Sequence, residues 1–178
     1  MESFSEGANR MRLVDPKTLS LGVFRLFGAQ NALLTAGDRS ELNTMTIGWC
    51  QLGRIWNEPA CTVYVRPERY TYEFTEGHDY FTVSILPADR REVMQLCGTK
   101  SGREVDKVAE CALSVAYGAG DAPYFEEAEL VLVCKKLYAQ DMGAAHVVDG
   151  GPVDRFYGPK DGWHRMYIGQ ILEAYTRE

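Results

Sequence analysis

The sequence predicts a mainly β protein with a few short helices, folded as a closed or nearly closed antiparallel barrel. Short β-type segments separated by turn residues dominate the chain, and helical patterns are few and brief. The strict strand–helix–strand alternation of parallel sheets is missing, which favours an antiparallel arrangement. The 178 residues suit a single domain spanning residues 1–178, long enough to bury a core without disulfides.

The predicted strands are rich in β-branched and aromatic residues and end near Gly, Pro or Asp. They cover 23–27, 32–35, 45–52, 62–65, 80–86, 130–138, 146–149 and 166–175. The first two flank Gly28 and suggest a hairpin-like start. Gly48 lies inside the third, where a glycine indicates a bulge or the close approach of a ligand to the backbone.

Three short helices are predicted between the strands. The first covers 70–76, with Thr71 as N-cap and Gly77 at its end. The second covers 90–97 and ends at Gly98. The third covers 102–110, because Ser101 and Glu104 have the spacing of a capping box.

Composition excludes several classes of partner and site. The formal net charge of -6 argues against nucleic acid and anionic membranes as general partners. No apolar run approaches the length of a membrane span, and the N-terminus lacks the apolar core of a signal peptide. The five cysteines and three histidines are scattered without metal-ligand spacing, so we expect a cytoplasmic protein with reduced thiols and no metal.

One candidate site lies between a predicted strand and a predicted helix. Arg66, Arg69, Tyr70 and Thr71 bring two guanidinium groups, a phenol and a hydroxyl to a helix start. Forked charged donors beside free helical N–H groups suit a phosphate. The alternative is that the arginines are solvated or pair with nearby glutamates while Thr71 only caps the helix.

A second candidate is the turn that contains Lys100, Ser101 and Gly102. Exposed amides at such a turn can hold an oxyanion, although the spacing is not that of a Walker loop. The alternative is a well-capped surface helix.

A third candidate is the polar strand start Asn43, Thr44, Met45 and Thr46, followed by Trp49. Its N–H and C=O groups could meet the edge of a heterocycle, with Met45 and Trp49 supplying soft or aromatic surface. The alternative is an ordinary strand entry followed by a core tryptophan.

A fourth candidate is Trp163–His164, just before the last predicted strand. The histidine could act as an acid, a proton shuttle or a hydrogen-bond donor. A structural role is the alternative, and nothing in the sequence suggests a nucleophilic triad.

Taken in order, these segments resemble the flavin reductase-like, FMN-binding split-barrel family, including its flavoredoxin branch. The resembling segments are 43–49, 63–71, 80–84, 97–103, 105–107 and 164–169. The resemblance implies FMN bound non-covalently in a groove beside a homodimer interface. It implies that residues 43–46 meet the isoalloxazine edge, and that Arg66, Arg69, Tyr70 and Thr71 surround the phosphate with Lys100, Ser101 and Gly102 nearby.

One motif departs from the family pattern. Many members that use NAD(P)H carry Gly-Asp-His before the last strand, whereas this chain has Gly162-Trp163-His164. We therefore expect an FMN-dependent oxidoreductase that takes electrons from NAD(P)H or a protein donor and passes them to a flavin, ferric or protein acceptor. The alternatives are a flavoredoxin-like electron carrier with little NAD(P)H activity, and a non-catalytic flavin- or heme-binding protein.

Overall fold

The computed structural model describes residues 11–158 and 162–177, so residues 1–10, 159–161 and 178 of the predicted 1–178 domain lie outside it. The strands are β1 (Met11–Val14), β2 (Ala32–Gly37), β3 (Leu42–Ile47), β4 (Cys50–Ile55), β5 (Glu58–Val65), β6 (Tyr80–Ile85), β7 (Val115–Tyr117), β8 (Pro123–Phe125), β9 (Leu130–Asp141) and β10 (Arg165–Arg177). The helices are α1 (Val23–Arg25), α2 (Tyr70–Gly77), α3 (Arg91–Thr99) and α4 (Lys107–Glu110). Single turns are η1 (Pro16–Thr18), the π-helical η2 (Leu26–Gln30), η3 (Ala119–Asp121), η4 (Ala144–His146) and η5 (Val153–Arg155).

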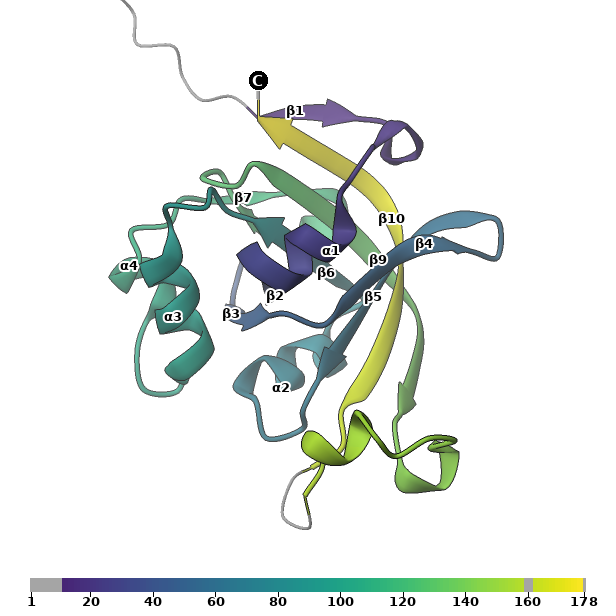
Figure 1. Ribbon diagram of the computed structural model, residues 1–178. Coiled ribbons are helices and arrows are strands. Elements are labelled where there is room, and N and C mark those ends of the chain that lie inside the picture. The colour runs from purple at the N-terminus through teal and green to yellow at the C-terminus, as the bar shows by residue number, and fades with distance from the viewer. Residues whose placement is uncertain (1–10, 159–161, 178) are drawn as a thin grey trace, which may run out of the picture.

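The main sheet is antiparallel and curls into a barrel with one slit (Figure 1). Its strand order is β3-β2-β6-β9-β10-β5-β4, with β1 paired to β10. β3 and β4 lie at opposite ends of this order, yet only Gly48 and Trp49 connect them. A link of that length spans at most about 11 Å, so the two ends of the sheet must approach each other. They share no ladder, and the predicted split antiparallel barrel is therefore confirmed.

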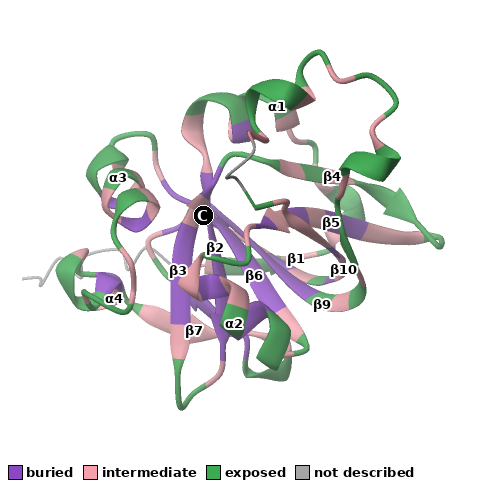
Figure 2. Ribbon diagram, turned by 90° about the horizontal axis from the view of Figure 1, so that it is seen from below, coloured by how far each residue is buried: buried purple, intermediate pink, exposed green. Residues whose placement is uncertain are grey.

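Two apolar layers fix the shape of the barrel. Leu34 and Leu132 belong to the interior cluster, while their neighbours Leu33 and Val131 belong to an outer cluster that also contains Val93 of α3. Alternate side chains of β2 are thus buried on both faces of the sheet. Figure 2 shows this burial along β2, β3 and β6, while the surrounding helices also carry exposed and intermediate residues.

Three strand predictions need correction. Residues 23–27 are helical, because Val23, Leu26 and Phe27 have the spacing of one helical face and pack on the interior cluster. Residues 45–52 are divided at Gly48 into parts of β3 and β4, and 146–149 form no strand. The predictions for 32–35, 62–65, 80–86, 130–138 and 166–175 are confirmed, with boundary differences.

The helix predictions differ in their caps and in one length. Arg69, not Thr71, is the N-cap of α2, and Thr71 lies inside the helix, fully buried. The long helix over 102–110 is wrong: only Lys107–Glu110 is helical, capped by the Asp106 carboxylate. The Ser101 hydroxyl instead accepts from the Arg103 amide 3.2 Å away, in a local turn that replaces the expected capping box. No helix among the described residues is long and apolar enough to cross a membrane.

Candidate functional site

The slit leaves one edge of β3 without a partner strand, and the register decides which backbone groups face outward. The Asp38 amide donates to the Glu41 carbonyl at 2.8 Å, and Gly37 pairs with Leu42 next to it. Because hydrogen-bonded and non-bonded pairs alternate, the backbone groups of Thr44 and Thr46 point away from β2. The amides of Thr44 and Thr46 therefore lie on the open edge, as recognition of a heterocycle would need.

A buried lysine ties this edge to α3. Lys107 Nζ donates to the Thr44 carbonyl at 2.8 Å and to the Cys97 carbonyl at 3.1 Å. Burial lowers the pKa of Lys107, and both acceptors are neutral. Sequence reasoning assigned no role to Lys107, although it lies in the resembling segment 105–107. Its position holds the turn after α3 against β3.

A pocket of about 120 Å³ opens at the start of the β3 edge, and it brings most of the predicted phosphate and edge residues together. The predicted residues that line it are Asn43, Met45, Arg69, Tyr70, Thr71, Lys100, Ser101 and Gly102. Its other walls come from Glu68, Thr99 and Lys107. The volume suits a group of phosphate size and is below that of pockets enclosing whole ligands.

Local hydrogen bonds shape this small pocket. Asn43 Nδ2 donates to the Thr71 hydroxyl at 2.8 Å, which joins β3 to α2. A Cβ on Gly102 would lie 2.0 Å from Asn43 Oδ1, so the turn needs glycine there. One Arg69 nitrogen donates to the Gly98 carbonyl at 2.8 Å, which fixes the guanidinium at the pocket wall.

The remaining predicted residues lie elsewhere. The Thr44 hydroxyl is buried and bonds to the Leu34 carbonyl, while the Thr46 hydroxyl donates to the Met94 carbonyl at 2.6 Å. Arg66 turns away from the small pocket: it donates to the Phe156 carbonyl at 2.9 Å. Arg66 and Arg69, which were expected to contact one phosphate together, therefore lie in two separate places.

Arg66 joins an aromatic cluster formed by Trp49, Phe156, Tyr157, Trp163 and His164. Trp49 lies 5.0 Å from the Phe156 ring and 4.7 Å from the His164 ring. Tyr157 stacks on Trp163 at 4.0 Å with a 12° interplanar angle. Trp49 and Phe156 are 37% and 48% exposed, so the cluster presents an aromatic surface. Phe156 and Tyr157 were missed from sequence, where only an aromatic pair in a loop marks them.

The aromatic cluster and the small pocket are neighbours. Glu68 lines the pocket and its carboxylate lies 3.7 Å from Arg66, which contacts the cluster. The predicted site residues therefore form one continuous region around the slit, with cations and amides at one end and aromatic rings at the other.

The imidazole of His164 is neutral at physiological pH. Burial and the Arg66 charge lower its pKa to about 4, partly opposed by the Glu68 carboxylate. Its Nδ1 lies 2.7 Å from the Tyr157 hydroxyl. If the phenol donates, His164 Nε2 carries the proton and can donate in turn.

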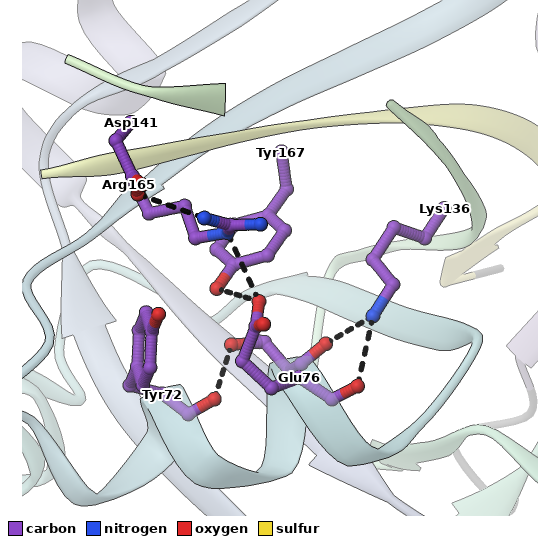
Figure 3. Close-up of polar contacts among 7 residues, drawn as sticks. Tyr72, Glu76, Lys136, Asp141, Arg165 and Tyr167 are labelled. Atoms are coloured by element: carbon purple, nitrogen blue, oxygen red, sulfur yellow. Dashed lines mark hydrogen bonds and ion pairs between the residues drawn. The ribbon is translucent and has the colours of Figure 1, made fainter. Parts of the chain in front are cut away.

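A polar network at the far end of α2 fixes this helix relative to the site. The Glu76 carboxylate accepts from the Tyr167 hydroxyl at 2.6 Å and pairs with Arg165 at 3.1 Å (Figure 3). Arg165 also bonds to Asp141 at 2.9 Å, and Lys136 donates to the last carbonyls of α2. This network joins β9 and β10 to α2. It therefore fixes the position of α2 relative to His164, which directly precedes β10.

Comparison with known proteins places this site in context. A family model described as "Flavin reductase like domain" matches residues 24–178. The chain is similar to flavoredoxin from Methanosarcina acetivorans, with 25% identity over 84% of this chain and 69% of that one, and a TM-score of 0.66. It is also similar to an FMN-binding domain of a flavin reductases-like enzyme from Shewanella baltica (19% identity, 94% and 78% covered, TM-score 0.66).

A third similar structure is an NADH:FAD oxidoreductase from Streptomyces globisporus, with 19% identity, 94% and 89% of the two chains covered and a TM-score of 0.63. No curated protein sequence matches this chain at a significant level.

Proposed function

Because the chain belongs to the flavin reductase-like family, we propose that it binds FMN non-covalently at the slit and works as an FMN-dependent oxidoreductase. The observation that carries this proposal is the phosphate-sized pocket at the start of the open β3 edge. A flavin mononucleotide has a phosphate at one end and a planar hydrogen-bonding ring at the other. The pocket and the β3 edge offer a complementary group to each.

The residues present suit this cofactor. Arg69 and Lys100 would neutralise the phosphate, and the Ser101 hydroxyl and turn amides would donate to its oxygens. The outward amides of Thr44 and Thr46 would meet the ring edge, while Trp49 would supply aromatic surface. When bound, FMN supplies the electron-accepting and electron-donating chemistry, and the protein supplies binding, orientation and electrostatics.

We propose NAD(P)H as the electron donor, received at the aromatic cluster. A neutral His164 can donate to a carboxamide oxygen, and Trp163 offers a face for stacking. Tyr157 takes over the orienting task that an aspartate at position 163 would perform, since its hydroxyl lies 2.7 Å from His164 Nδ1. No catalytic base is needed, because the hydride acceptor is the flavin itself.

The second candidate is an electron carrier that receives its electrons from a protein, and passes them on without NAD(P)H. The exposed aromatic rings of Trp49 and Phe156 favour it, because aromatic residues are enriched where proteins meet. Steady-state oxidation of NADH and NADPH by FMN-loaded protein, with free FMN or a ferric chelate as acceptor, separates the two. Turnover supports the reductase, whereas reduction by dithionite without NAD(P)H turnover supports the carrier.

A titration tests the cofactor itself. Quenching of flavin fluorescence should show FMN bound more tightly than riboflavin, because riboflavin has no phosphate for the small pocket. Equal affinities would contradict the phosphate assignment, and no binding of either flavin would contradict the proposed function.

We further propose a homodimer and a single domain in a reducing, cytoplasmic compartment. The single domain is supported by the pairing of β1 with β10, which joins the two ends of the described chain. The compartment is supported by the five free cysteines. The dimer is supported by exposed apolar side chains on β4, β9 and the turn after β4, which are Ile55, Trp56, Leu137 and Tyr138.

A further inference from the structure

A second pocket, of about 340 Å³, lies at the opposite end of the β3 edge from the small pocket. It is bounded by the end of η2, the end of β3 and the segment that leads into α3. Its walls are Ala29, Gln30, Asn31, Thr46, Pro87, Ala88, Arg90, Arg91, Met94 and Gln95. The volume falls within the range of pockets that bind small molecules. None of these residues except Thr46 belongs to the site described above.

The pocket is positive in a chain whose formal net charge is -6. Arg90 and Arg91 are its charged residues, and no carboxylate lines it. Within the described part of the chain, neither guanidinium forms an ion pair or a side-chain hydrogen bond. Two unpaired guanidinium groups beside the first amides of α3 suit an oxyanion with several acceptor oxygens.

The backbone that forms the opposite wall is strained. Asn31 has φ 62° and ψ -179°, a combination that is almost confined to glycine. It directly follows the π-helical turn η2, a type of irregularity common at functional sites. Asn31 Oδ1 lies 2.9 Å from the point that a Cβ on Gly48 would occupy, so its side chain reaches the link between β3 and β4.

The same wall contains a buried acceptor. The Oε1 atom of Gln30 is buried and has no hydrogen-bond partner among the described residues. Because this oxygen accepts hydrogen bonds and an oxyanion offers none, the anion site depends on the arginines. A strained backbone and two unpaired arginines thus meet around one cavity.

The position of this pocket relative to the slit indicates which ligand it serves. Asn43 lines the small pocket and Thr46 lines the second one. They are three residue steps apart along the strand, or about 10 Å. One flavin phosphate can occupy only one end of this edge. A second phosphorylated ligand that reaches the same flavin would need a separate anion site, and the second pocket offers one at the other end.

We propose that the second pocket binds the pyrophosphate of a dinucleotide electron donor, with Arg90 and Arg91 as its main ligands. Gly48 lies beside Asn31 of the pocket wall and directly precedes Trp49 of the aromatic cluster. A dinucleotide can therefore lie between the second pocket and the aromatic cluster. The dinucleotide as ligand rests on the proposed function, whereas the anion site rests on the pocket alone. The other phosphate source is FMN itself, which the experiment distinguishes.

The test uses full-length protein, a double variant Arg90→Gln/Arg91→Gln, and a control Arg12→Gln/Lys17→Gln. The control removes two exposed cations that lie far from the pocket walls in sequence and do not line it. Calorimetric titration of inorganic pyrophosphate into FMN-loaded protein measures the anion site without turnover. Fluorescence quenching measures the FMN dissociation constant of each protein.

The double variant should bind pyrophosphate at least about tenfold more weakly than wild type and the control, the smallest factor expected from one hydrogen bond to a charged group. Its FMN dissociation constant should stay within about twofold of wild type, and its KM for NADH or NADPH should rise while kcat is retained. Equal pyrophosphate binding in wild type and the double variant would overturn the proposal.

Two further outcomes separate the anion site from the proposed function. Weaker FMN binding in the double variant, without pyrophosphate binding to the loaded wild type, would assign the pocket to the FMN phosphate and overturn the proposal. If the protein binds no flavin, the proposed function fails, and the same pyrophosphate titration on the flavin-free protein still decides the anion site.

Discussion

At the scale of single residues, neighbours in the sequence have separate tasks at the site. Arg69 faces the small pocket, whereas Arg66 bonds to the Phe156 carbonyl within the aromatic cluster. Thr71 is not the N-cap of α2; its hydroxyl instead accepts a hydrogen bond from the side-chain amide of Asn43. The sequence motif is compact, but the chain turns from β5 into α2 within it, and the side chains therefore diverge.

This difference gives a direct prediction for FMN affinity. Arg69→Ala should weaken FMN binding by about 1.5–3 kcal/mol, the range for a hydrogen bond to a charged group, while riboflavin binding changes little. Fluorescence titration of both ligands checks this, with Arg66→Ala as the matched comparison. A larger loss of FMN affinity in Arg66→Ala than in Arg69→Ala would place the phosphate beside the aromatic cluster.

The hydroxyl of Tyr157 can be tested separately from its ring. Tyr157→Phe keeps the ring that stacks on Trp163 and removes the partner of His164 Nδ1. Reduction of the bound flavin by NAD(P)H should slow by about 2- to 10-fold, as expected for one hydrogen bond, without a change in the FMN dissociation constant. Anaerobic stopped-flow mixing measures this rate of flavin reduction. An unaltered rate in Tyr157→Phe would make the contact between Tyr157 and His164 structural.

The depressed pKa of His164 also predicts a dependence of stability on pH. In the unfolded chain this histidine takes up its proton near pH 6.5, whereas in the folded protein it does so only near pH 4. The unfolded state therefore binds more protons in that interval, and stability falls as the pH is lowered through it. His164→Gln should lose less stability between pH 6.5 and 4 than wild type, measured by urea unfolding at several pH values. A parallel decline in both proteins would mean that other groups cause it.

At the scale of elements, the strands were easier to predict than the place where the barrel opens. Segments 62–65, 80–86 and 130–138 were recognisable because β-branched and apolar residues fill them between clear turn residues. The break at Gly48 was hidden, since β-forming residues lie on both sides of it and a single glycine also fits a bulge. The helix at 102–110 failed because Ser101 forms a local turn and Asp106 caps a later start.

The sequence predicted which residues would make up the candidate site, but not how they would be arranged. Most of the residues predicted to hold a phosphate line one pocket, because they lie on either side of two turns that meet at β3. Lys107, Phe156 and Tyr157 could not be found in this way, since their roles depend on contacts with distant segments. A buried lysine bonded to carbonyls leaves no local pattern in the chain.

Asn31 gives a prediction at this scale, because it joins the π-helical turn η2 to β2. Asn31→Gly should stabilise the fold by about 1 kcal/mol. Glycine adopts the observed backbone conformation without strain, and its greater conformational freedom in the unfolded chain offsets part of this gain. For a domain of this size the melting temperature should rise by about 2–4 °C. Differential scanning calorimetry measures it, and a lower melting temperature would show that the side chain of Asn31 contributes more than its strain costs.

At the scale of the whole molecule, the barrel exposes apolar side chains at the far end of β4. Trp56 is 58% exposed and lies 6.4 Å from Tyr138, both on the turn and strand proposed as a dimer contact. The turn itself is tight, with positive φ at Trp56 and Asn57, which directs the tryptophan outward. An aromatic pair displayed in this way suits the centre of an interface between two copies.

The dimer can be tested with variants of that pair. Trp56→Ser/Tyr138→Ser should raise the dimer dissociation constant by about 30-fold or more, the factor that corresponds to one central contact of 2 kcal/mol. Sedimentation or light scattering over a range of concentrations measures the change. Phe24→Ser is the control, because Phe24 is 94% exposed and belongs to α1 rather than to this turn. A wild-type protein that stays monomeric at micromolar concentration would contradict the dimer.

The open edge of β3 has one more consequence, for the protein before it acquires its cofactor. An unpaired strand edge is a template on which another chain can add a strand, and this makes it a starting point for aggregation. Lys107 already occupies the outward carbonyl of Thr44 in the middle of this edge, so an incoming strand would meet a charged amine where it needs a free acceptor. The lysine thus opposes self-association of the flavin-free chain at the same edge that is proposed to bind the cofactor.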